Sequence, residues 1–166
     1  MAERKRRPSP HRGDVFELPT TDGRFGYGLV IVGGGRPYIA ILRGVYDSRP
    51  AVDELEHKHV GLVGWTMDSW FYHGRWAVVG KLDPDGFPVP YPNYIVGIDG
   101  ELHATDYKGE VLGPASPDER DLLDYQSSRS PVGFHNAFLA LHGYRDWDAG
   151  DDKLTADHAR LRMTRT

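Results

Sequence analysis

Apolar and polar residues alternate with a period of two through much of the first half of the chain. One short run covers residues 15–18, and a longer one covers residues 25–32. A two-residue period is typical of strands. Asp22-Gly23 lies between the two runs and favours a tight turn. We therefore expect a hairpin here. Two glycines in its second strand suit strong curvature or a close approach of the backbone to another segment.

Further runs predict the rest of a β-rich core. Residues 38–42 are apolar on both faces, which indicates a central strand. Residues 61–65 and 76–80 read as further strands. Asp99-Gly100 separates residues 94–98 from residues 101–107, and this dipeptide fits a two-residue hairpin turn.

The last third of the chain changes to helical signals. Ser116-Pro117-Asp118-Glu119 has the form of a capping box with proline at the first helical position, so a helix should run to about Tyr125. A second helix should begin at Ser130-Pro131 and end at Gly143. The expected fold is α+β: a mostly antiparallel, strongly curved sheet or small open barrel, with two or three helices in the C-terminal third.

Length and composition suggest one domain with extensions. The 166 residues can bury a single core. We expect residues 1–12 to be a disordered basic tail and residues 13–145 to form the domain. Residues 146–166 should form an acidic loop that can end in a short helix.

Charge is unevenly distributed. The net charge is −4, but residues 1–12 carry +4, which leaves −8 on residues 13–166. Such a body repels nucleic acid and attracts a basic partner. The chain has no cysteine and no apolar run of the roughly 20 residues that span a bilayer, so we expect a cytoplasmic protein that does not engage a membrane.

Histidines raise the question of a metal site. Asp53, His57, His59 and His103 are the candidate ligands, because the His-x-His pair places both rings on one face of a strand. Enzymes that hold two metals this way usually use a barrel of about 250 residues, which is longer than this chain. Surface histidines are the alternative. We expect no metal or other cofactor.

Exposed aromatic residues beside acidic ones are typical of protein-binding hot spots. The candidate partner-binding residues are Asp68, Trp70, Tyr72, Tyr91, Asp106 and Tyr107. Packing in the core is the alternative role for each aromatic ring.

The order of several segments resembles the immunity protein 26 family, whose members belong to bacterial polymorphic toxin systems. The segments that carry the likeness are residues 13–19, 22–28, 74–82, 88–92, 104–110 and 115–122. The resemblance implies a mostly β fold and a protein that is no enzyme. Such a protein binds a cognate toxin and blocks its active site or its access to substrate.

Two other functions stay open beside this one. The family grouping also carries a phosphotriesterase label, which allows a metal-dependent hydrolase that uses Asp53, His57, His59 and His103. A generic SH3-like interaction module is the third possibility.

Overall fold

The chain forms two antiparallel sheets and several helices, so the predicted α+β class is confirmed. A computed structural model describes residues 9–56 and 58–165. The larger sheet has five strands in the order β4-β3-β2-β1-β5 and stays open, with β4 and β5 at its edges. Its strands are β1 (Asp14–Pro19), β2 (Phe25–Val32), β3 (Tyr38–Leu42), β4 (Val60–Trp65) and β5 (Ala77–Lys81).

The first hairpin shows why the glycines of β2 are needed. A Cβ atom at Gly26 would enter the ring of Phe138, and one at Gly28 would enter the ring of Phe16. These positions allow close approach of aromatic rings to the backbone. In the turn, Gly23 has a φ of +81°. Glycine adopts this conformation without strain.

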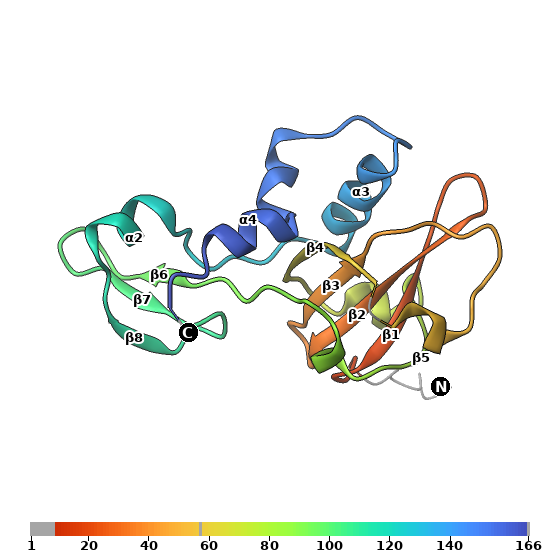
Figure 1. Cartoon of the computed structure of the whole chain (residues 1–166), viewed down its shortest axis with the longest axis horizontal. Coiled ribbons are helices and arrows are strands. Elements are labelled where there is room, and N and C mark those ends of the chain that lie inside the picture. Colours follow the sequence, from red (N-terminus) through yellow and green to blue (C-terminus); the bar gives the residue numbers. More distant parts are fainter. Residues whose placement is uncertain (1–8, 57, 166) are drawn as a thin grey trace, which may run out of the picture.

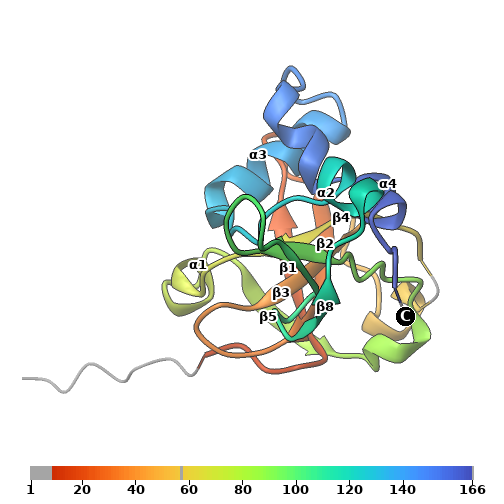
Figure 2. The ribbon, with the colours of Figure 1, turned by 90° about the vertical axis from the view of Figure 1, so that its left-hand side faces the viewer.

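Helices cover both faces of the larger sheet. One face buries Phe16 and Leu18 beneath α1 (Ser69–Tyr72) and α3 (Pro131–Leu141). The other face carries Val15 and Tyr38 and is covered by η1 (Val52–Leu55), the extended residues 87–91 and α4 (Ala156–Leu161). Figure 2 shows α1 and α3 on one side of the strands and α4 on the other. None of the described helices is long and apolar enough to cross a bilayer.

The smaller sheet lies beside the larger one, at the left of Figure 1. Its strands are β6 (Tyr94–Val96), β7 (His103–Thr105) and β8 (Val111–Pro114), and α2 (Pro117–Leu122), which ends earlier than predicted, follows them. The hairpin predicted around Asp99-Gly100 is formed by β6 and β7, although both strands are shorter than expected. The chain reaches this sheet from β5 through η2 (Pro84–Gly86) and an extended, proline-rich segment.

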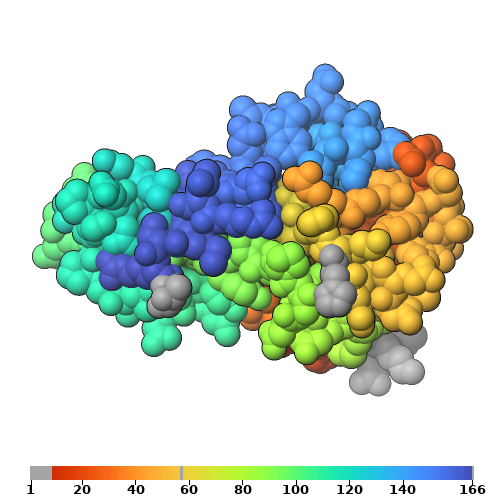
Figure 3. Space-filling view, in the orientation of Figure 1, coloured from red at the N-terminus to blue at the C-terminus, as the bar shows by residue number. Residues whose placement is uncertain are grey.

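Residues 164 and 165 hold the smaller sheet in place by hydrogen bonds to Asn93 and Glu119. After η3 (Ala149–Leu154) and α4, the backbone N–H groups of Thr164 and Arg165 both donate to Oδ1 of Asn93, each at 2.9 Å. The Arg165 guanidinium donates to the buried carboxylate of Glu119, through Nε at 3.0 Å and Nη2 at 2.6 Å. We call residues 162–165 the C-terminal arm. In Figure 3 the dark blue C-terminal residues lie against the teal part of the chain that includes the smaller sheet.

The expected N-terminal tail is described only in part. Residues 1–8 lie outside the described residues. Pro10 is buried, and its carbonyl accepts a hydrogen bond from the Gly34 N–H at 2.9 Å. Residues 10–12 therefore pack against the loop that joins β2 to β3.

Candidate functional site

The six predicted partner-binding residues fall into two groups. Asp68, Trp70 and Tyr72 lie at α1, whereas Tyr91, Asp106 and Tyr107 lie beside the connection to the smaller sheet. Across residues 9–56 and 58–165, no hydrogen bond, ion pair or ring contact joins one group to the other.

The α1 group mixes core and surface. Trp70 is half-buried and packs edge-on against Trp76, with ring centroids 5.5 Å apart. The Arg75 guanidinium lies 5.4 Å from the Trp70 ring. Tyr72 is 37 % exposed, and Asp68 accepts a hydrogen bond from Ser9 Oγ at 3.1 Å. Tyr72 thus offers an exposed aromatic surface, while Trp70 also stabilises the core.

The second group is built on aromatic rings in contact. Tyr91 and Tyr107 have ring centroids 4.6 Å apart, and both pack against the buried Tyr38. The Tyr107 carbonyl accepts a hydrogen bond from Trp65 Nε1 at 3.1 Å. Burial raises the pKa of Tyr91, so its hydroxyl stays protonated at neutral pH.

These two tyrosines line a pocket of about 430 Å³, which we call the tyrosine pocket. Its wall is completed by Arg12, Ile31, Val32, Gly33, Asp85 and Lys108. Arg12 and Asp85 form an ion pair of 2.7 Å, and Lys108 Nζ lies 5.6 Å from the Tyr107 ring. Aromatic walls with a few charged groups suit a protein side chain that is itself amphipathic.

Asp106 shapes the turn at the edge of this pocket. Its Oδ1 accepts hydrogen bonds from the backbone N–H groups of Lys108 at 2.9 Å and Glu110 at 2.8 Å. This arrangement is a local turn motif that aspartate favours. Asp106 therefore positions Lys108.

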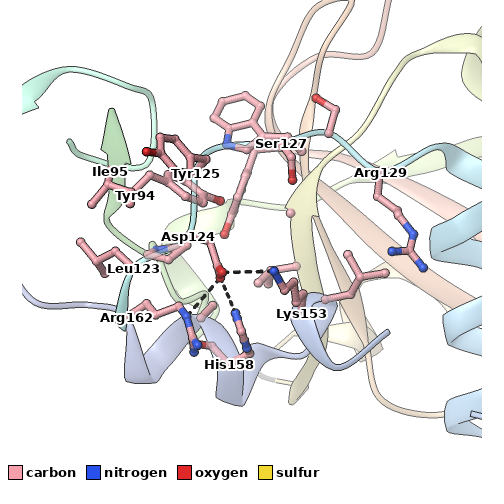
Figure 4. Close-up of a pocket in the computed structure, with 18 of the residues that line it drawn as sticks. Tyr94, Ile95, Leu123, Asp124, Tyr125, Ser127, Arg129, Lys153, His158 and Arg162 are labelled. Atoms are coloured by element: carbon pink, nitrogen blue, oxygen red, sulfur yellow. Dashed lines mark hydrogen bonds and ion pairs between the residues drawn. The ribbon is translucent and has the colours of Figure 1, made fainter. Parts of the chain in front are cut away.

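Another pocket lies where the two sheets meet, and we call it the junction pocket. It has a volume of about 550 Å³ and is lined by β4, β6, the chain after α2, and α4. In Figure 4, Asp124 points to the centre of three cationic or titratable side chains. His158 Nε2 lies 2.7 Å from the carboxylate, Arg162 Nε 3.2 Å and Lys153 Nζ 3.3 Å.

The electrostatics of this cluster favour an ionised Asp124. Burial by itself raises the pKa of Asp124, but hydrogen bonds from His158 and Lys153 outweigh it and leave the pKa lowered. The cluster ties α4 to the chain that follows α2. Sequence reasoning missed it because Asp124 and His158 lie far apart in the sequence, although His158 and Arg162 share a helical spacing of four.

His135 is half-buried and lies against the core. Trp76 Nε1 donates to His135 Nδ1 at 3.2 Å, so Nε2 carries the proton and donates to the Pro19 carbonyl at 3.0 Å. Burial lowers the pKa of His135 despite the hydrogen bond to Pro19. These contacts make His135 a structural residue.

The comparison with protein families decides the identity. The sequence model of the immunity protein 26 family matches residues 11–101, more than half of the chain. The chain belongs to the immunity protein 26 family. No curated protein and no solved structure matches it significantly.

This membership makes the chain an immunity protein of a toxin system, and it favours a role other than catalysis. The matched residues include all five strands of the larger sheet and β6. The α1 group and Tyr91 lie within the matched range, whereas Asp106 and Tyr107 lie beyond it.

Three of the four candidate metal ligands of this immunity 26 protein lie among the described residues. Asp53 lies on η1 and is exposed, as is His59. His103 Nδ1 lies 3.1 Å from the Glu101 carbonyl. His57 is outside the described residues. Among the residues that are described, no three His, Asp or Glu side chains gather in a way that would hold a metal ion.

Proposed function

We propose that this immunity protein binds a cognate toxin directly and neutralises it by covering its active site or blocking access of its substrate. The observation that carries the proposal is the family match, which extends over the whole larger sheet. Immunity by occlusion requires a surface with strong anchor residues. The two aromatic groups offer such a surface.

Charge supports the choice of partner. Residues 13–166 carry −8, so a basic toxin would be attracted over a distance of about a Debye length. Complementary charge raises the association rate more than it raises affinity. A cognate toxin with an excess of Lys and Arg is therefore the partner we propose.

Co-expression with the neighbouring open reading frame tests this function. The proposal expects that product to arrest growth alone, to be tolerated beside this protein, and to co-purify with it. A non-toxic product, or a toxic one that fails to bind, would remove the main support for an immunity role.

Substitutions of the anchor residues test the surface. Trp70→Ala and Tyr107→Ala should each weaken binding by about 30-fold, the equivalent of about 2 kcal/mol for a hot-spot residue. Both side chains also contact the core, so Tyr72→Ala provides a change at a more exposed position, with an expected loss of about tenfold. Tyr125, 54 % exposed beside the smaller sheet, is the matched control. Unchanged affinity in all three variants would exclude this surface.

A further inference from the structure

The two edges of the larger sheet differ in what covers them. At β4, Leu62 forms an isolated bridge with Thr155 and Trp65 forms one with Ser128. At the other edge, β5 pairs with β1 alone among the described residues. Within the described ranges, the outer backbone groups of β5 therefore have no strand partner.

The side chains of β5 are unusual for a free edge. Val78 is 49 % exposed and Val79 is 40 % exposed. The pairing with β1 skips Val79, which leaves this residue without a partner across the ladder. Natural edges are normally protected by charges or bulges; β5 has the bulge at Val79, but Lys81 is its only charged residue. An apolar strand of this kind is a template for pairing with another chain.

A hollow lies next to the start of β5. It has a volume of about 290 Å³, and Phe71, Trp76, Ala77 and Val78 form its apolar wall. Asp14 lines it as well, with its carboxylate paired to Lys81 Nζ at 3.0 Å. When a peptide adds to a sheet edge, backbone bonds provide affinity and such adjacent pockets provide specificity.

Acidic residues surround the far end of β5. Val52 of η1 packs against Gly80, which brings the exposed Asp53 and Glu54 of the same turn near the strand. Exposed Asp83 and Asp85 follow β5 directly. Two cations of the described residues near this strand are paired, Lys81 with Asp14 and Arg12 with Asp85. This end of the edge therefore favours an incoming Lys or Arg.

The smaller sheet has a rival edge at β8, where Val111 is 57 % exposed and Leu112 is 43 % exposed. Pro114 of that strand has no N–H group to offer a partner. Its carbonyl already accepts a hydrogen bond from Arg165 Nη2 at 2.7 Å. The C-terminal arm thus uses part of the β8 edge, and β5 is the better template.

We propose that β5 receives an extended segment of the toxin as a sixth strand. One apolar side chain of that segment fills the hollow beside Phe71 and Trp76, and one or two Lys or Arg side chains face the acidic end. This proposal rests on the proposed function, because it names the surface that the toxin uses. It extends the predicted α1 group, since α1 and β5 are joined by residues 73–76.

Charge substitutions on the two edges provide a matched test. The probe is the toxic product of the neighbouring reading frame, with affinity measured by titration calorimetry. Val78→Lys and Val79→Lys should each weaken binding at least about tenfold, by about 1.4 kcal/mol. Val111→Lys and Leu112→Lys change residues of similar exposure on β8 and should stay within about twofold of the wild type. Circular dichroism melts check that all four variants fold.

Hydrogen exchange on the wild-type complex gives a second measurement that needs no variant. Amides of residues 77–81 should exchange more slowly in the complex, while those of residues 111–114 should not change. If the wild type binds the toxin and both β5 variants bind it with unchanged affinity, this proposal is wrong and the proposed function stands. The same holds if the wild type binds and the exchange of the β5 amides does not change. A toxic product that does not bind the wild type counts against the proposed function itself. If Val78→Lys instead separates a homodimer and leaves toxin affinity unchanged, a second copy occupies the edge and the proposal is wrong.

Discussion

Replacing Arg165 with Met removes the guanidinium that faces a buried carboxylate. Glu119 is 6 % exposed and accepts hydrogen bonds from Arg165, from the Thr164 hydroxyl at 2.9 Å and from the Ser116 backbone at 3.1 Å. The hydrogen bond from Arg165 is the largest influence, and together these contacts outweigh burial and lower the pKa of Glu119 to about 2.

The size of the effect follows from this pKa. A fall from 4.5 to about 2 corresponds to about 3 kcal/mol of stability at neutral pH. The Arg165 side chain is 30 % exposed, so solvent screens part of its contribution. Because its hydrogen bond is still the largest influence on Glu119, we expect Arg165→Met to remove at least half of that stabilisation at neutral pH.

The pH dependence has a definite sign. Because the pKa of Glu119 is lower in the folded state, the stabilisation is present above about pH 4.5 and is lost as the pH falls towards about 2. The difference between wild type and Arg165→Met should therefore shrink over that interval. Urea unfolding at several pH values measures it, and Glu119→Gln completes a double-mutant cycle.

An exposed ion pair provides the control. Arg160 Nη1 and Asp157 Oδ1 lie 2.8 Å apart on α4, with side chains 45 % and 77 % exposed. Exposed pairs of this kind contribute little, so Arg160→Met should cost less than about 0.5 kcal/mol. Equal losses for the two arginine variants, or a loss at Arg165 that persists at the acid end of the titration, would refute the reasoning.

Three further changes test other parts of the fold. Because burial lowers the pKa of His135, stability should fall as the pH drops below about 6.5, and His135→Gln should flatten that dependence in urea titrations. Gly28→Ala should lower the free energy of unfolding by about 1–3 kcal/mol, measured by thermal melts, because the new Cβ meets the Phe16 ring. The loss should be smaller in a Phe16→Leu background, and equal losses in both backgrounds would show that the strain does not come from Phe16. Asp124→Asn should speed hydrogen exchange in α4, while unchanged exchange would show that its ion pairs do not hold that helix.

Local signals predicted the larger sheet well. The strands β1 and β2 follow the two-residue period, and a glycine-containing turn joins them. The continuous apolar run of residues 38–42 predicted β3, and the bounds predicted for β4 and β5 differ from the observed ones by at most one residue. The strand β8 was missed because Gly113 and Pro114 read as loop residues, and α1 was missed because one helical turn is too short for a periodic pattern. The capping box at Ser116 was predicted correctly from four consecutive residues.

Contacts between distant residues could not be predicted in the same way. The sequence marked Glu119 as a capping residue, but Arg165, its partner in the ion pair, lies 46 residues later. The sequence showed that aromatic residues gather around Trp70 and Tyr107. How much of each ring is buried depends on its packing against Trp76 or Tyr38, which the sequence does not show. The edge position of β5 follows from its pairing with β1, the first strand of the chain. No local sequence pattern predicts a pairing between strands so far apart.

The C-terminal arm has a consequence for the order in which the protein folds during synthesis. The strands of the larger sheet leave the ribosome first, whereas Asn93 and Glu119 must wait for residues 164 and 165 to complete their hydrogen bonds. The smaller sheet should therefore become stable only after residues 164 and 165 have been synthesised. A chain truncated before the C-terminal arm would keep the β5 edge and lose the hydrogen bonds that hold the smaller sheet in place.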